Sequence, residues 1–225
     1  APLYLTSLVR CGESEAWGTY SENGHGVCWT TDGGRTWQKK QWRGTAVYGV
    51  QPSGEGKVWA CGGQGDHWAP GSGVVLTSDD AGETWRRHVP RGQTTFLRGV
   101  ELPRRQALIV NGYTGRVSRG PVDSSEGWSY SKALAARMTA RQIAMADART
   151  GWVVGKRAPE ADGSEQDDGR EGRIFATRDA GKTWKRQASE LAFPAATGVF
   201  STDARHAWVV GDGGLLVATR DGGAS

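Results

Sequence analysis

Three observations predict an all-β fold, a β-propeller of about five four-stranded antiparallel blades. First, one phrase, Ser/Thr-x-Asp-x-Gly-x-Thr-Trp, recurs along the 225 residues of the chain. Second, a short apolar run that ends in glycine precedes each copy of this phrase. Third, β-branched and aromatic runs alternate with Gly, Asp, Ser and Pro throughout, a pattern of short strands and tight turns. Repeats of about 40 to 50 residues with four strands each are typical of propeller blades.

The repeated phrase sets the length of the unit. Full copies run from Thr30 to Trp37, from Ser78 to Trp85 and from Thr177 to Trp184, and a shortened copy runs from Thr219 to Gly223. Their aspartates, Asp32, Asp80, Asp179 and Asp221, are 48, 99 and 42 residues apart, so the middle interval holds about two units. We call each copy a repeat turn, and we expect it to connect the third and fourth strands of a blade.

The apolar run predicts the second strand of each blade. Its copies are Val58 to Gly62, Gly151 to Gly155, Ala207 to Gly211, a looser Ala16 to Gly18, and Leu108 to Gly112 inside the long interval. There the stretch from Val117 to Trp128 takes the place of a degenerate repeat turn. We expect the Ala-rich segment from Lys132 to Ala146 to be a loop followed by a strand at about Arg141 to Ala146.

These units predict one propeller domain with blades at approximately residues 1–43, 44–92, 93–132, 133–190 and 191–225. The last repeat turn lacks its Thr-Trp. Either the ring closes with an incomplete blade or the chain belongs to a longer propeller, and we prefer the five-bladed ring.

Each fixed position of the repeat turn has a structural role. We expect the Asp side chain to accept hydrogen bonds from the amides one and two residues on, as in an Asx-turn, while Gly relieves the strain of positive φ. Thr and Trp begin the outgoing strand, and Trp covers the sheet edge between blades. Because the phrase recurs in every blade, we assign a structural role to Asp32, Gly34, Trp37, Asp80, Gly82, Trp85, Asp179, Gly181, Trp184 and Asp221.

The repeat turn resembles the Asp-box, or BNR repeat, of sialidases, sortilin-type receptors and photosystem II assembly-factor propellers. The strand Trp-Val-Val-Gly and the segment from Gly214 to Gly223 are most similar to the photosystem II assembly-factor group, and sialidases and sortilin are more distant. The resemblance spans nearly the whole chain, with a degenerate third blade. It implies a propeller that binds another protein or complex as a scaffold or accessory subunit, in the periplasm or outside the cell.

Strand alternation places the candidate binding residues. The loops between strands two and three and the crossings between blades should share one end of the propeller, where connections reach ligands. His25 and Trp42 fall in these connections, as do Asp66, His67 and Trp68 in the long loop from Gly62 to Gly73. Among the 11 tryptophans most occupy second strands or repeat turns, and Trp29 is expected in the core. The long loop is either a plain surface loop with a packed aromatic or a lectin-like site.

Arginines favour a protein partner. Arg104, Arg105 and Arg116 give the third and fourth blades an arginine-rich character, although the formal net charge is only +4. Guanidinium groups suit the carboxylates of protein interfaces, and the interleaved aromatics of nucleic-acid binders are missing from this sequence. We therefore predict a protein partner, with a glycan as the alternative and no nucleic acid.

The sequence motifs do not favour catalysis. No Gly-x-Ser-x-Gly, His-Glu-x-x-His, phosphate-loop or sialidase Phe-Arg-Ile-Pro phrase occurs, and the four histidines lack zinc spacing. The acidic segment from Lys156 to Gly172 is typical of a solvated segment rather than a calcium loop. We predict a protein that is not an enzyme and has no metal or cofactor. A glycoside hydrolase that uses Asp66 and a carboxylate of the acidic segment is the third alternative.

The cysteines leave two possibilities open. Cys11, Cys28 and Cys61 cannot all pair within one molecule, so there is either one disulfide with a spare thiol or three small core residues. No apolar run approaches the length of a membrane span.

Overall fold

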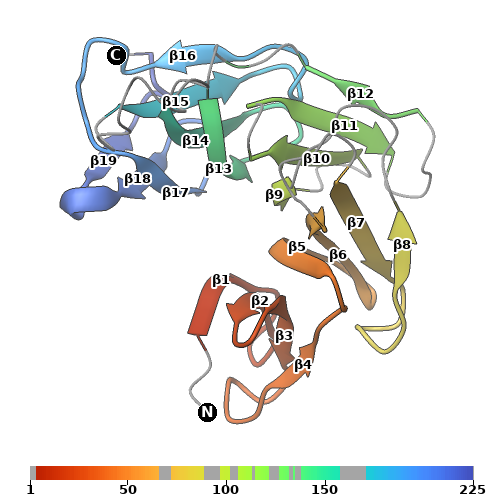
Figure 1. Ribbon diagram of the computed structural model, residues 1–225. Helices are drawn as coiled ribbons and strands as arrows, with labels where there is room; N and C mark the ends of the chain where they lie inside the picture. Colours follow the sequence, from red (N-terminus) through yellow and green to blue (C-terminus); the bar gives the residue numbers. More distant parts are fainter. Residues whose placement is uncertain are drawn as a thin grey trace. The chain divides into compact units, whose positions relative to one another are not determined.

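The computed structural model describes residues 4–65, 72–88, 97–101, 106–112, 115–121, 127–131, 134, 138–157 and 171–224. Figure 1 shows the strands in chain order, coloured from the N-terminus to the C-terminus. Two compact units, residues 1–100 and 101–225, divide the chain, and each is described by itself.

The first unit holds two complete blades, each an antiparallel meander in which neighbouring strands pair in sequence order. Blade one consists of β1 (Tyr4–Arg10), β2 (Ala16–Ser21), β3 (His25–Thr30) and β4 (Gln38–Lys40). Blade two consists of β5 (Thr45–Gly54), β6 (Lys57–Gln64), β7 (Gly73–Ser78) and β8 (Arg86–His88).

The later blades repeat this order. Blade three consists of β9 (Leu97–Glu101), β10 (Gln106–Asn111), β11 (Val117–Pro121) and β12 (Ser129–Tyr130). Blade four consists of β13 (Met138–Met145), β14 (Gly151–Arg157), β15 (Gly172–Thr177) and β16 (Lys185–Gln187). Blade five consists of β17 (Ala196–Ser201), β18 (Ala207–Gly211) and β19 (Leu216–Thr219), with the short 3-10 helix η2 (Asp212–Gly214) before β19.

The predicted fold class is confirmed: the chain is an all-β propeller of five blades. Blades one to four have four strands, whereas blade five has three within the described residues. The strand expected at about Arg141 to Ala146 is present, but it begins earlier, at Met138, and ends at Met145.

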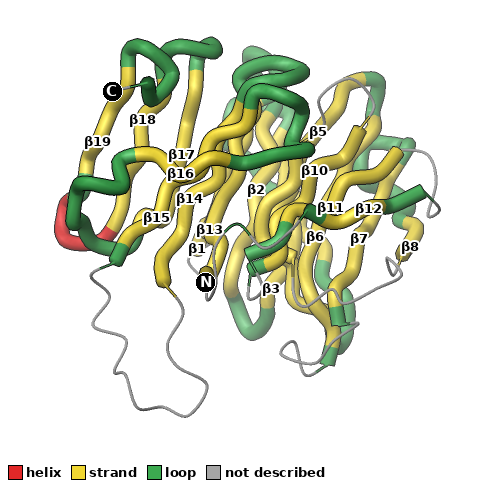
Figure 2. The backbone as a smooth tube through the Cα atoms, turned by 90° about the horizontal axis from the view of Figure 1, so that it is seen from above, coloured by secondary structure: helices red, strands yellow, loops and turns green. Residues whose placement is uncertain are grey.

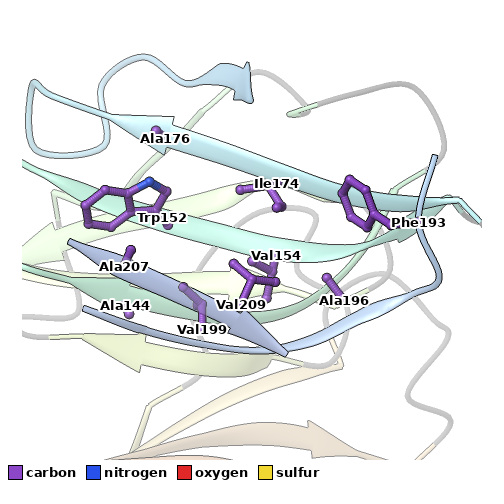
Figure 3. Packing of buried hydrophobic residues seen from close by; sticks show 10 residues of the cluster. All are labelled: Ala144, Trp152, Val154, Ile174, Ala176, Phe193, Ala196, Val199, Ala207 and Val209. Atoms are coloured by element: carbon purple, nitrogen blue, oxygen red, sulfur yellow. The ribbon is translucent and has the colours of Figure 1, made fainter. Parts of the chain in front are cut away.

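The first, second and third strands of the blades contribute the apolar core. In the first unit, Trp17, Val27 and Trp29 of blade one pack with a set from blade two, Val47, Val50, Val58, Ala60, Val74 and Leu76. In the second unit, Trp152, Val154 and Ile174 of blade four pack with Ala196, Val199, Ala207 and Val209 of blade five (Figure 3). Burial of such side chains stabilises each by roughly 1.5 to 3 kcal/mol, so consecutive blades hold one another. Trp29 is a core residue, as expected.

The repeat turn is held by a hydroxyl and a carboxylate together. Thr30 Oγ1 accepts from the amides of Asp32 (3.3 Å) and Gly34 (2.9 Å) and donates to Asp32 Oδ1 (2.7 Å). Asp32 in turn accepts from the amide (2.9 Å) and the hydroxyl (2.6 Å) of Thr36. The same bonds recur around Asp80 and Asp179.

The expected Asx-turn is therefore wrong for the three full copies. The hydroxyl two residues before each Asp accepts the hydrogen bonds of the nearby amides, so the carboxylate accepts instead from the Thr four residues further along the chain. Of the four repeat-turn aspartates, only Asp221 accepts from the amide two residues on, that of Gly223 at 3.0 Å. The expected positive φ is present, for example 92° at Gly82.

The turn tryptophans have a second role. Their Nε1 atoms donate to the carbonyl of the turn glycine, from Trp37 to Gly34 at 3.1 Å, from Trp85 to Gly82 at 2.9 Å and from Trp184 to Gly181 at 3.2 Å. Trp85 and Trp184 also pack, partly buried, against the apolar clusters between blades. Each tryptophan thus closes its own turn.

Each blade has two different ends, which Figure 2 shows as green connections at the ends of yellow strands. At one, the turn end, the repeat turn donates an amide to the connection between strands one and two: Gly33 to Ser14 (2.8 Å), Ala81 to Gly56 (2.7 Å), Ala180 to Arg149 (2.9 Å) and Gly222 to Arg205 (2.8 Å). At the other, the crossing end, the connection between strands two and three bonds to a blade crossing: Gly65 to Gly44 (3.1 Å), Gly172 to Phe193 (2.8 Å) and Asp212 to Ala195 (3.0 Å). The expected separation of the two sets of connections is present.

A β-bulge in the first strand sets which side chains leave the sheet. The pairing of β1, β5, β13 and β17 with the next strand skips one residue each time, and the extra residues are Thr6, Tyr48, Arg141 and Thr197. Bulges re-aim a side chain and are frequent beside functional sites.

Candidate functional site

The described candidate residues lie at crossing ends. His25 begins β3, Trp42 lies between β4 and β5, and Arg116 lies between β10 and β11. The other candidates, Asp66, His67, Trp68, Arg104 and Arg105, lie outside the described residues.

In the first unit, a bulge residue brings three blades together. The ring of Tyr48 lies 5.2 Å from the ring of His25, and the Arg98 guanidinium lies 5.1 Å from the Tyr48 ring centre. Burial raises the pKa of the Tyr48 hydroxyl, and the positive charge of Arg98 opposes that rise. A cation over an aromatic ring is a favourable contact. Sequence reasoning missed Tyr48 and Arg98, because a bulge leaves no fixed residue signature.

The other polar groups of this crossing end are largely paired. Lys39 Nζ lies 2.6 Å from Glu22 Oε2 and 5.4 Å from the ring centre of Tyr20. The hydrogen bond from Lys39 lowers the pKa of Glu22. Gln41 Nε2 donates to the Glu22 carbonyl at 3.0 Å. The charges of Lys39 and Glu22 therefore offset each other.

Trp42 has a packing role in the structure. Its side chain is partly buried against the core between blades one and two, and its ring stands edge-on to that of Trp85 at 5.3 Å. Its backbone carbonyl accepts from the Thr45 amide at 3.1 Å and so closes the blade crossing. Packing accounts for this residue.

Among the described residues of the second unit, three arginines lie around the Glu171 carboxylate. Glu171 lies 3.3 Å from Arg157 Nη1 and 4.0 Å from Arg186 Nη2, and it also pairs with Arg173. Arg157, Arg186 and Glu171 are partly exposed, whereas Arg173 is mostly buried. We call these four residues the arginine cluster. Among the described residues, these three guanidinium groups and the Glu171 carboxylate gather at the crossing end of blade four.

The register of one hairpin assembles this cluster. Because β14 and β15 pair Lys156 with Gly172 and Gly155 with Arg173, the two ends of the acidic segment meet at the crossing end. Arg186 arrives from β16, which pairs with Phe175 of β15. A sequence signal for this cluster exists, since Arg157 and Arg173 flank the carboxylates of the acidic segment.

Two further arginines of blades three and four are described. Arg116 uses its carbonyl to accept from the Asn111 amide at 2.8 Å. Arg141 is the bulge residue of β13, and its Nε is buried without a hydrogen-bond partner among the described residues.

The described residues contain no group of three or more His, Cys, Asp or Glu side chains placed to hold a metal ion. Of the cysteines, Cys28 and Cys61 are buried and Cys11 is exposed, and all three are free thiols. The possibility of three unpaired cysteines is the one that the structure shows, although Cys11 is a surface residue. No described helix is long and apolar enough to cross a membrane.

The fold is similar to that of several solved propellers. The structure of YCF48 bound to D1 peptide matches with a TM-score of 0.58 at 13% identity, over 99% of this chain and 65% of that chain. The GH74 enzyme of Niastella koreensis matches with a TM-score of 0.67 at 15% identity, over 98% of this chain and 37% of that chain. The WD40 β-propeller domain of Doa1 matches with a TM-score of 0.61 at 9% identity, over 99% of this chain and 70% of that chain.

These likenesses establish the fold alone. This chain spans less than two thirds of the length of the YCF48 and GH74 structures. No family model matches the sequence, and no curated protein matches it. Since propellers of this kind include both a peptide-bound protein and an enzyme, function must be argued from the site.

Proposed function

We propose that this chain is a non-catalytic β-propeller scaffold or accessory subunit that binds another protein or protein complex through crossing ends of its blades. The observation that carries the proposal is the arginine cluster of blade four, where the side chains of Arg157 and Arg186 are partly exposed beside Glu171. Guanidinium groups bind carboxylates through paired hydrogen bonds, so the favoured partner presents an acidic segment.

One structural comparison and one sequence resemblance support a protein partner. The YCF48 structure holds a D1 peptide, and its fold is similar to that of this chain. The repeat turn resembles the Asp-box, and we propose a distant relationship to propellers of the photosystem II assembly-factor type. This resemblance also supports a periplasmic or extracellular location, which fractionation of the native source would test.

Affinity purification with paired charge reversals tests the proposal. The tagged chain is used to capture proteins from the native source at low and at moderate salt. Arg157→Glu with Arg186→Glu reverses the exposed part of the arginine cluster. The matched control, Arg149→Glu with Lys182→Glu, makes the same charge change at the turn end of the same blade. We expect the first pair to lose the captured partner and the control to keep it.

The result that would overturn this surface is an equal yield of partner with both variants. Moderate salt should weaken capture by the unaltered chain, because partly exposed charges are screened. Arg173 is left unchanged since its mostly buried side chain supports β15 against Glu171.

The alternative is a carbohydrate-binding propeller or, third, a glycoside hydrolase. The similarity in fold to a GH74 enzyme favours this class of ligand. The residues proposed for it are Asp66, His67 and Trp68. A glycan array probed with the chain and with Trp68→Ala tests binding, and aryl glycosides with Asp66→Asn as control test hydrolysis.

A further inference from the structure

Arg141 of β13 carries a charge without a counter-charge. The residue is partly buried, and its Nε atom is buried with no hydrogen-bond partner among the described residues. None of the ion pairs between described residues uses its guanidinium group, so the two Nη atoms are left to solvent. A charged group that is partly removed from water and has no partner is costly to the fold. An acceptor that arrives from outside the chain would offset this cost.

A β-bulge fixes the position of this arginine. The pairing of β13 with β14 skips Arg141 between Ala140 and Gln142. Bulges re-aim a side chain and are over-represented next to functional sites. The next residue, Gln142, accepts a hydrogen bond from the Val199 amide of β17 through its Oε1 atom at 2.9 Å. This bond ties the bulge of blade four to the first strand of blade five.

The neighbouring first strand presents a second polar group. β13 and β17 pack against each other (Figure 1), and Thr197, the bulge residue of β17, lies two residues before the Val199 that Gln142 contacts. Thr197 is exposed, and its hydroxyl donates to the Val210 carbonyl at 3.5 Å. A hydrogen bond of this length is weak, so the hydroxyl can turn to another acceptor at little cost.

The first unit shows how an arginine of a first strand can be accommodated by the chain itself. The Arg98 guanidinium of β9 lies 5.1 Å from the ring centre of Tyr48, the bulge residue of β5. The face of an aromatic ring attracts a cation. In the second unit the arginine is itself the bulge residue, and the bulge residue of the next first strand is Thr197, which has no ring.

We propose that Arg141 binds a carboxylate ligand. A guanidinium group presents parallel N–H donors that match the two oxygens of a carboxylate, and its single positive charge balances one monoanion. Arg141 supplies the charge and the paired donors, and Thr197 supplies a hydroxyl donor to the same ligand. The site uses no residue of the arginine cluster and does not rest on the proposed function.

The Nε–H resonance of Arg141 in proton–nitrogen NMR spectra of the whole chain tests the proposal. Arg141→Lys identifies this resonance by its loss. Acetate and acetamide are titrated in parallel at constant ionic strength, because they have nearly the same shape and differ in charge. We expect a saturable shift with acetate and none with acetamide. Thr197→Val should weaken the binding of acetate by about threefold.

The internal control is Arg149, an exposed arginine in the connection between β13 and β14 of the same blade. Its Nε–H resonance should show no saturable shift with acetate. The carboxylate assignment would be overturned by a saturable shift of the Arg141 resonance with inorganic phosphate but not with acetate.

Urea unfolding gives a second measurement that needs no resolved resonance. In chloride buffer, Arg141→Leu should unfold at a higher urea concentration than the unaltered chain, because it removes an uncompensated charge, while Arg149→Leu should show no such gain. Acetate at the same ionic strength should raise the unfolding midpoint of the unaltered chain and not that of Arg141→Leu. A loss of stability in Arg141→Leu, or an equal response of both proteins to acetate, would show that Arg141 supports the fold and is not a binding residue.

Discussion

Cys11, Cys28 and Cys61 differ in environment although their residue type is the same. Burial raises the pKa of Cys28 to about 11 and also raises the pKa of the fully buried Cys61. Cys11 is exposed, and its pKa is raised by partial burial and by Glu15. Because the thiolate is the reactive form, accessibility and pKa together rank the thiols.

We predict that a thiol reagent such as DTNB labels only Cys11 in the folded chain, slowly at neutral pH, and all three cysteines after unfolding. Cys11→Ala should abolish labelling of the folded chain and leave two reactive thiols in urea. Rapid labelling of the folded Cys11→Ala variant would contradict the burial of Cys28 and Cys61.

Glu101 at the end of β9 gives the chain a predicted pH dependence. Burial raises its pKa to about 8, compared with about 4.3 in an unfolded chain. Since the folded state holds this proton more tightly, the contribution of Glu101 to stability is present at low pH and is lost as the pH rises through about 8.

The Glu101→Gln variant should therefore lose less stability than the unaltered chain between about pH 5 and pH 9. Urea unfolding at both values measures the difference. If the free energies of unfolding of the two proteins changed equally between these pH values, ionisation of Glu101 would not destabilise the folded chain. Sequence reasoning gave no reason to select this residue, because the burial of one strand-end carboxyl depends on the packing around it.

At the scale of the element, the repeat turn was predictable and its bonding was not. The phrase fixes where β3, β7 and β15 end, because Asp, Gly and Thr at this spacing serve a turn in any context. The phrase does not show which side-chain atom accepts the hydrogen bond of each backbone amide. In the structure, the hydroxyl two residues before the Asp accepts the amide hydrogen bonds that were expected for the carboxylate.

Ser78 supplies this hydroxyl in the repeat turn of blade two, where its role can be tested by substitution. It is buried, it accepts the amides of Asp80 (3.3 Å) and Gly82 (2.8 Å), and it donates to Asp80 Oδ1 at 2.7 Å. We predict that Ser78→Ala destabilises the chain by about 1 to 3 kcal/mol, because the Gly82 amide is left unsatisfied where water is excluded. Urea unfolding measures the loss.

Ser78→Thr should keep most of the stability, since Thr30 and Thr177 have this role in blades one and four. Ser53→Ala removes an exposed hydroxyl that donates to the Lys57 carbonyl at 3.4 Å, and it should change the stability little. Equal losses for Ser78→Ala and Ser53→Ala would show that the hydroxyl does not organise the turn.

The candidate site was less predictable than the turn, for reasons that differ by residue. His25 and Trp42 lie at crossing ends, as strand alternation predicted, because connections between antiparallel strands alternate in direction. Tyr48 was missed since its place depends on one extra residue in β5, and the arginine cluster was missed since it depends on the register of β14 with β15. Long-range register is a property of packing, which local sequence does not encode.

At the scale of the whole molecule, stability in a repeat array comes from intrinsic blade stability plus contacts with neighbouring blades. Within the second unit, blade four packs against blade three through Val153 and Phe175 and against blade five through Trp152 and Ile174. Blade five packs against blade four through Val209, while Trp208 on its other face is partly exposed. Loss of one apolar contact face should lower the free energy of local opening.

We therefore predict that the amides of β18 exchange with deuterium about tenfold faster or more than those of β14 when the chain is dilute. The two strands are matched, because each lies in its sheet between two antiparallel neighbours and carries the same Trp-Val-Val-Gly sequence. Hydrogen exchange followed by mass spectrometry compares them directly. Equal exchange of the two strands in dilute solution would mean that the exposed face costs blade five no stability, and that each blade is held mainly by its own hydrogen bonds.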